Sequence, residues 1–162
     1  MKISAQDEYG LRVLLQIARS DSQTGISIPQ LMKVEGLSQS YVAKLTRALR
    51  LANLIQSTRG HKGGYVLARP ASSITINEVF NALGGTLFED GFSEPHSDML
   101  SLCTNSIDCS INSLWKIVNF AMDRVLGRIT LANLMRCDTE VNQSLKKILE
   151  EEFISLQQMS IQ

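Results

Sequence analysis

Two cysteines, Cys103 and Cys109, are the residues of this chain best suited to redox or metal chemistry. Five residues separate them, and they come directly before a predicted helix, whose N-terminus favours the ionised thiolate. A thiolate in such a place can ligate a metal or react with an oxidant. The spacing alone does not choose between these roles, because isolated cysteines are also often small buried hydrophobic residues. The close CxxC pair typical of zinc sites does not occur.

A second polar group lies between Leu37 and Tyr65, on a predicted helix followed by a hairpin. Ser38 has the side chain of a good N-cap, and an apolar stripe follows it at helical spacing. Lys44, Arg47 and Arg50 fall on the opposite, outward side. Strand-like residues 54–58 and 65–68 flank a tip that carries two cations, a histidine and three glycines: Arg59, Gly60, His61, Lys62, Gly63 and Gly64. Glycines permit close backbone approach, so the tip is predicted to meet phosphate or a groove.

These residues need a scaffold, and the preceding sequence predicts one. Residues 4–19 have a helical apolar face with acidic residues in the first turn. Ser27 caps a second helix over 28–35, which contains Pro29 near its start and ends at Gly36. This helix, a short turn and the basic helix form a helix-turn-helix, to which the hairpin adds a wing. Amphipathic helices before hairpins also occur in unrelated domains, but the order and the shared positive charge favour a DNA-binding domain.

The remaining sequence predicts more helix, so the fold class is mainly α. Helices are expected at 76–83, at 111–128 after Ser110, at about 131–135 after Thr130, and at 140–157 after Thr139. The apolar stripe of 111–128 is too broad for one small domain to cover, which predicts a homodimer. We therefore expect a winged helix-turn-helix domain (1–83), a cysteine-containing sensor loop (84–110), a dimerisation helix with a short helix (111–136) and a C-terminal helix (137–162).

Charge is divided between the two halves of the chain, although the net charge is zero. Residues 1–70 contain ten Lys or Arg and four Asp or Glu, whereas residues 71–162 contain six and twelve. The basic half is the electrostatic footprint of a DNA-binding domain. No stretch is apolar enough to span a membrane, and the N-terminus does not resemble a signal peptide, so a cytoplasmic location is expected. We expect no enzyme, because the sequence shows no nucleophile–base pair, no phosphate loop followed by Lys-Ser/Thr and no paired carboxylates on a rigid element.

Three segments resemble the IscR-type (Rrf) family of winged-helix regulators. They are YGLRVLLQIA, SQSYVAKLTRALRLANLIQSTRGHKGGYVLARP and CSINSLWKIVNFAMDRVLGRITLANL, and the resemblance covers roughly residues 1–136. It implies a homodimer whose long helices cross, with each cysteine loop near the first helix of the other subunit. Many members hold an iron-sulfur cluster there and repress or activate transcription according to its state.

The same resemblance implies a ligand set for a 2Fe–2S cluster. Members usually have three cysteines at six-residue steps; the last two correspond to Cys103 and Cys109, but Ser97 occupies the first position. A histidine that some members carry is Asn112 here. Relatives can supply a carboxylate at the position of Glu8, and histidine can replace cysteine in such clusters. The hypothesis is that Cys103, Cys109, His96 and the partner subunit's Glu8 hold the cluster, through which the protein senses redox, iron-sulfur status or nitric oxide.

Each non-cysteine ligand has a simpler interpretation. Glu8 can complement the helix dipole, and His96 can be a solvated loop residue. Asp7 and Asp98 are substitutes, and Cys137 is expected to be a free thiol without a role. Two alternative functions remain: a cluster-free regulator that uses Cys103 and Cys109 as a thiol switch, and one whose loop 86–102 contacts a small ligand or a partner.

The resemblance also implies how double-stranded DNA is read. We expect four residues of the basic helix to approach the major groove: Ser40, Tyr41, Lys44 and Arg47. Arg59 is expected in a neighbouring minor groove. Contacts to phosphate are expected from Ser27, Gln39, His61 and Lys62. A symmetric dimer predicts a pseudo-palindromic operator with half-sites about one helical turn apart.

Overall fold

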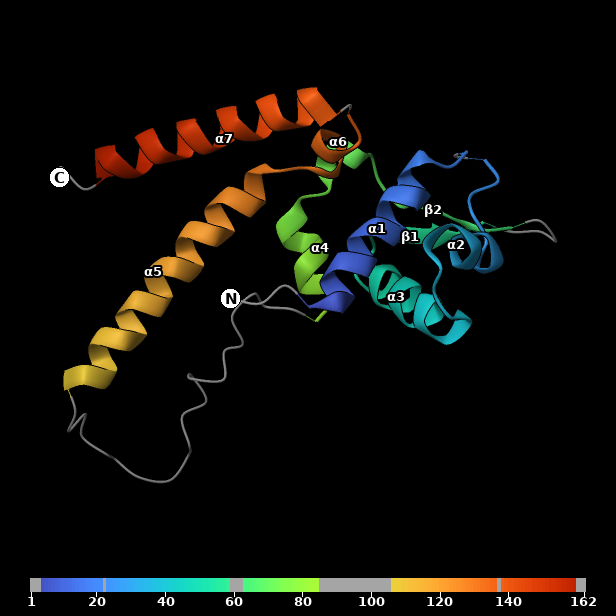
Figure 1. Cartoon of the computed structure of the whole chain (residues 1–162), viewed down its shortest axis with the longest axis horizontal. Helices are drawn as coiled ribbons and strands as arrows, with labels where there is room; N and C mark the ends of the chain where they lie inside the picture. The colour runs from blue at the N-terminus through green and yellow to red at the C-terminus, as the bar shows by residue number, and fades with distance from the viewer. Residues whose placement is uncertain (1–3, 22, 59–62, 85–105, 137, 160–162) are drawn as a thin grey trace.

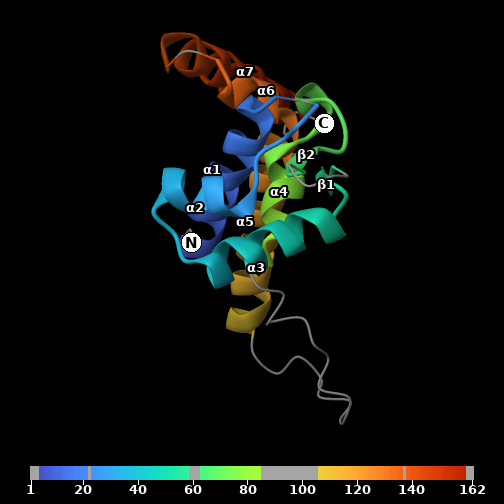
Figure 2. The same cartoon turned by 90° about the vertical axis from the view of Figure 1, so that its right-hand side faces the viewer.

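The computed structural model describes residues 4–21, 23–58, 63–84, 106–136 and 138–159. In chain order the elements are α1 (Ala5–Arg19), α2 (Ile28–Glu35), α3 (Gln39–Leu51), β1 (Ile55–Ser57), β2 (Tyr65–Leu67), the short 3-10 helix η1 (Ala71–Ser73), α4 (Ile76–Ala82), α5 (Ser106–Arg128), α6 (Leu131–Leu134) and α7 (Asp138–Met159). A compact part holds α1 to α4 and the hairpin, and the long helices α5 and α7 extend from it on one side (Figure 1). In Figure 1 α4 lies between α5 and α1, and α2 and α3 lie farther from α5. In Figure 2, which views the molecule from the side of the hairpin, α5 lies behind the compact part.

The hydrophobic core surrounds α1, which packs against α2, α3, α4 and β2. Val13, Leu14 and Ile17 of α1 are buried, as the helical spacing of apolar residues predicted. Partners come from every neighbouring element, and those almost fully buried include Leu31, Val42, Leu45, Leu49, Leu54, Ile55, Ile74, Val79, Leu83 and Leu131. Burying each such side chain stabilises the fold by about 1.5–3 kcal/mol, so this core fixes where α3 sits.

Serine side chains cap the starts of α1 and α3. Ser4 Oγ accepts from the Asp7 amide at 3.2 Å, and Asp7 Oδ2 accepts from the Ser4 amide at 3.0 Å. Ser38 Oγ accepts from the Tyr41 amide at 3.3 Å. Each cap satisfies amides that the helix itself leaves without partners. The predicted starts of α1 and α3 are therefore confirmed.

The hairpin is antiparallel, with Ile55 opposite Leu67 and Ser57 opposite Tyr65. On its other side Tyr65 pairs with Ile26, through amide-to-carbonyl bonds of 3.1 and 2.9 Å. A one-residue bridge leaves no repeating pattern in the sequence from which it could have been predicted. A Cβ on Gly64 would lie 2.6 Å from the backbone of Ile26. Ile26 thus forms a third strand segment beside β2. Gly64 permits close approach to this segment of the protein itself and not to a ligand.

A second pairing joins the compact part to the long helices. Residues 74–76 run antiparallel to residues 129–131: the Ile76 amide donates to Ile129 at 2.8 Å, and the Leu131 amide donates to Ile74 at 2.8 Å. The short helix η1 lies between β2 and this pairing. This pairing fixes the C-terminal end of α5 beside the start of α4.

Two helix starts differ from the sequence prediction. The helix predicted from residue 111 begins at Ser106, and the last helix begins at Asp138 rather than residue 140. Asp108 and Asp138 then fall in first turns, where the helix dipole favours acidic residues, and serine is tolerated inside a helix. Cys109 therefore belongs to the first turn of α5 and does not precede the helix.

Candidate nucleic-acid interface

The turn between α2 and α3 sets the direction in which α3 projects. Gly36 ends α2 with φ of 67°, a left-handed conformation that glycine adopts without strain. Ser38 then caps α3, and its Oγ lies 3.2 Å from the Ser40 Oγ. Two helices joined through so short a turn form the predicted helix-turn-helix.

One face of α3 is buried and the other is basic and exposed. Val42, Leu45, Thr46 and Leu49 point into the core, and the buried Thr46 hydroxyl donates to the Val42 carbonyl at 2.9 Å. Arg50 lies on the exposed side of α3. The same side carries these residues expected to contact DNA: Gln39, Ser40, Lys44 and Arg47. A helix that presents cations and small polar groups at its N-terminal half suits a major groove.

Tyr41 is different from these residues because it is half-buried. Its ring meets the ring of Tyr9 edge to face, with centroids 6.2 Å apart and planes at 81°. The Arg12 guanidinium lies 5.7 Å from the centroid of Tyr9. Edge-to-face pairs and cation–π contacts are both attractive. Tyr41 thus connects the first turn of α3 to α1, in addition to any contact that it makes with DNA.

Arg12 also connects α1 to the end of α2. Its Nε donates to Glu35 Oε2 at 2.7 Å, and Gln16 Nε2 donates to Glu35 Oε1 at 2.8 Å. The Glu35 side chain is only 2% exposed. An acidic residue is unfavourable at a helix C-terminus, so these two donors are needed to keep the carboxylate there. Sequence reasoning missed Glu35 because its donors lie about twenty positions away in the chain.

Thr58 closes the base of the wing. The Thr58 amide donates to the Gly64 carbonyl at 2.9 Å, and the Gly64 amide donates to Thr58 Oγ1 at 2.8 Å. The tip residues Arg59, His61 and Lys62 lie outside the described residues. Ser27, expected to contact phosphate, precedes α2, and its amide and hydroxyl both donate to Gln30 Oε1 at 2.8 and 2.7 Å.

Of the expected cluster ligands, Glu8 is the one whose side chain the structure describes. Its carboxylate is 62% exposed, and the nearest charged partner is Arg12, with Nη1 at 3.9 Å. The substitute ligand Asp7 is buried, and its Oδ2 is already engaged by Ser4. Cys103, His96 and Asp98 lie outside the described residues, as does Cys137; Cys109 is described only as a residue of α5. Glu8 is therefore the more accessible of the two carboxylates, whereas Asp7 is buried with Oδ2 in the α1 cap and Oδ1 without a hydrogen-bond partner among the described residues.

Among the described residues, no group of three or more His, Cys, Asp or Glu side chains is placed to hold a metal ion. No helix among them is long and apolar enough to cross a membrane.

The helix-turn-helix, the third strand segment and the hairpin define a winged helix-turn-helix transcription regulator. Comparison with known proteins gives the family. The profile of the Rrf2 family, described as "Iron-dependent Transcriptional regulator", matches residues 3–137, and the chain belongs to this family. The resemblance to IscR-type regulators is thereby confirmed at the level of the family.

Individual relatives agree with this assignment. The chain is 36% identical over 137 residues to Protein rrf2 of Nitratidesulfovibrio vulgaris, covering 84% of this chain and 88% of that protein. It is 29% identical over 141 residues to the transcriptional regulator IscR of Vibrio campbellii, covering 87% and 80%. The crystal structure of oxidised CymR from Staphylococcus aureus superposes with a TM-score of 0.63 at 32% identity, covering 85% of this chain and 98% of that one. IscR from T. potens gives a TM-score of 0.63 at 28% identity, covering 83% and 86%. These relatives are transcription regulators, not enzymes.

Proposed function

We propose that this chain works as a homodimer that reads a pseudo-palindromic operator with α3 and the wing. It senses redox or iron-sulfur status through Cys103, Cys109 and the two non-cysteine ligands His96 and Glu8. The exposed basic face of α3, held against a fixed core, is the observation that carries the DNA-binding part. Lys44 and Arg47 are assigned to base edges with Ser40 and Tyr41, Arg59 to the minor groove, and the other expected contacts to phosphate.

An exposed apolar face on α5 supports the homodimer. Leu114, Ile117 and Phe120 are 56%, 65% and 49% exposed, and their spacing of three places them along one side of the helix. Large apolar side chains gathered in this way usually mark a protein–protein interface. A second copy of α5 presents a matching face, as a two-fold axis requires.

The donor set fits an iron-sulfur cluster. Cys103 and Cys109 supply thiolates, His96 can supply an imidazole, and the exposed carboxylate of Glu8 is available to the partner subunit. A 2Fe–2S cluster would supply one-electron redox chemistry, and histidine ligation generally raises its potential. Within this chain, Glu8 lies one helical turn before Arg12, so the ligand position and the α1–α2 junction share one face of α1.

An anaerobic absorption spectrum of freshly purified protein, with iron and sulfide assays, tests the cofactor. Bands between about 320 and 600 nm with near-equal iron and sulfide are expected. Cys103→Ala is expected to remove the colour and to uncouple DNA affinity from redox state. A protein that stays colourless after anaerobic reconstitution contradicts the cluster.

Selection of duplexes from a random library by the purified protein tests the DNA-binding part. The expected product is a two-fold symmetric sequence, with half-sites about one helical turn apart. Selection of no consensus, or of a single unrepeated half-site, contradicts a symmetric reader.

A thiol switch is the second candidate function. Ser97 stands where the family has its first cysteine, so two thiols of the loop remain, which is the number that a disulfide needs. In that case the protein is colourless, and an oxidant changes DNA affinity in a manner that a thiol reductant reverses. Mass spectrometry of the oxidised protein would then show a Cys103–Cys109 crosslink.

A further inference from the structure

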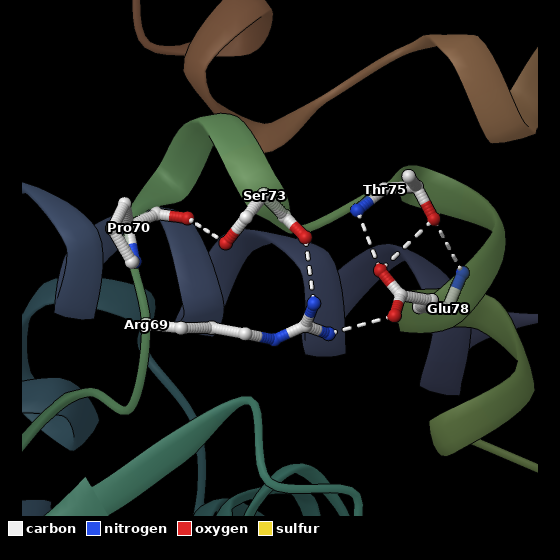
Figure 3. A network of polar contacts seen from close by, with 5 residues as sticks. All are labelled: Arg69, Pro70, Ser73, Thr75 and Glu78. Carbon is white, nitrogen blue, oxygen red and sulfur yellow. Dashed lines mark hydrogen bonds and ion pairs between the residues drawn. The ribbon is translucent and has the colours of Figure 1, made fainter.

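The connection between the wing and the dimerisation helix is a network of hydrogen bonds around Arg69. The Ala68 amide donates to the Leu54 carbonyl at 3.0 Å, so the chain leaves the hairpin at a fixed point. From the next residue, Arg69 Nη1 donates to the Ser73 carbonyl at 2.6 Å and Nη2 donates to Glu78 Oε1 at 2.7 Å (Figure 3). One planar guanidinium thus joins the end of the wing to both η1 and α4.

Glu78 continues the network toward α5. Its second oxygen, Oε2, accepts from the amide and the hydroxyl of Thr75 at 2.8 and 3.1 Å (Figure 3). Thr75 is the central residue of the pairing with residues 129–131, which directly follow α5. Hydrogen bonds therefore run from Arg69 through Glu78 to Thr75. The neighbours of Thr75 in the chain, Ile74 and Ile76, bond in turn to Leu131 and Ile129 after α5.

Capping of α4 does not by itself explain the arginine. The reciprocal Thr75–Glu78 bonds already complete the α4 cap. Arg69 adds a link across the loop that η1 forms, and it directs its charge at Ser73 and Glu78. Partial burial would raise the pKa of Glu78, but the bonds from Thr75 and Arg69 together outweigh it, so its pKa lies below the ordinary value. Glu78 is therefore ionised at neutral pH.

We propose that Arg69 is a positioning residue that fixes the wing relative to α5, and so fixes the spacing of half-sites that the homodimer accepts. This proposal rests on the proposed function, since it requires a dimer that binds two half-sites. The α5 pair sets the two-fold axis, and the network holds each reading domain at a set distance and rotation from it. Each base pair inserted between half-sites rotates one of them by about 34° about the DNA axis, so a rigid connection accepts few spacings.

The full-length protein and its variant Arg69→Lys provide the test. Lysine keeps the charge but has one ammonium group, which cannot reproduce the two-pronged contact with Ser73 and Glu78. Glu78→Gln alters the same link from its other end. Arg19→Lys is the matched control, because it makes the same exchange at an exposed site in the last turn of α1.

Affinity is measured by fluorescence anisotropy on the selected operator and on duplexes with one base pair added or removed at its centre. For the wild type and Arg19→Lys, a change of one base pair is expected to weaken binding about tenfold. For Arg69→Lys and Glu78→Gln the same change is expected to weaken binding about threefold or less, with near wild-type affinity for a single half-site.

Three results would overturn the proposal. The first is a wild-type spacing preference in both Arg69→Lys and Glu78→Gln. The second is an equal loss of affinity on every duplex in both variants, and the third is a loss of affinity confined to the isolated half-site. An Arg69 that contacts phosphate would instead tolerate lysine on all duplexes. Failure of the wild type to bind any duplex is recorded before the variants are used, and it counts against the proposed function itself.

Discussion

Arg12 Nε lies 2.7 Å from Glu35 Oε2, and this contact joins the middle of α1 to the last residue of α2. Glu35 directly precedes Gly36, where the chain turns toward α3. The pair is asymmetric, because the arginine side chain is 51% exposed and the carboxylate 2%. The buried partner therefore loses most when the contact is removed.

Arg12→Met is expected to lower the free energy of unfolding by about 2 kcal/mol, because Gln16 remains as the sole side-chain donor to Glu35. In a domain of this size that is a fall in melting temperature of roughly 4–8 °C, measurable by circular dichroism. Arg19→Met, at an exposed position of the same helix, is the control and is expected to melt with the wild type. Equal melting of the two variants would show that the contact does not contribute.

Gly64→Ala is expected to destabilise the protein by about 2 kcal/mol, because the new Cβ would lie 2.6–2.7 Å from backbone atoms of Ile26. Gly127→Ala in α5 is the matched control, since a Cβ there meets nothing within 4 Å. The control is expected to gain up to about 1 kcal/mol from helix propensity. Chemical denaturation measures both, and a tolerated alanine at position 64 would mean that the third strand segment can move away.

Ile117→Glu is expected to weaken the homodimer at least about 100-fold, since it places a charge on the exposed apolar face of α5. Leu51→Glu is the control, because Leu51 is an equally large apolar residue, 71% exposed on α3. Sedimentation velocity over a dilution series gives the dissociation constants. A dimer unaffected by the glutamate at position 117 would place the interface elsewhere.

Lys44→Ala is expected to cost about 1–3 kcal/mol on the selected operator and to relax the base preference at one position of each half-site. Arg19→Ala removes an exposed cation from the last turn of α1 and is expected to leave the preference unchanged. Repeating the duplex selection with each variant measures this. A uniform loss over all sequences for Lys44→Ala would reassign Lys44 to phosphate.

The stability of the wild type is expected to fall slightly faster than that of Glu78→Gln as the pH drops below about 4.5. The pKa of Glu78 is lowered by folding, so the folded protein holds fewer protons on this residue. The contribution of Glu78 to stability is complete above its pKa in the unfolded chain, and it is lost as the pH falls through its pKa in the folded protein. Because the side chain is 43% exposed, the effect is on the order of 0.5 kcal/mol. Denaturation curves at several pH values measure it, and parallel pH profiles would contradict it.

Local sequence patterns were enough to predict much of this fold. Leu14 and Ile17 repeat at helical spacing, and Ser4, Ser38 and Thr75 have the side chains that cap helices, so the positions of α1, α3 and α4 followed from the sequence. The same patterns placed Lys44 and Arg47 on an exposed face. Each of these features depends on residues within about one helical turn of each other.

The features that sequence reasoning missed depend on residues far apart in the chain. Ile26 pairs with Tyr65, Thr75 pairs with Thr130, and Arg12 meets Glu35. A single bridged residue has no repeating pattern, and a charged residue on a helix does not reveal its partner on another helix. The early start of α5 was missed because Ser110 satisfied the rule for a cap, although a longer helix was available.

The helix α7 begins at Asp138, the residue after the last one that the family profile matches. It packs on α5 and α6, and Arg128 Nη2 donates to Glu151 at 2.8 Å across that contact. The consequence is evolutionary: the length and composition of α7 can change without altering a residue of the reading domain. Sequence change confined to α7 therefore leaves α3 and the other described residues expected to contact DNA as they are.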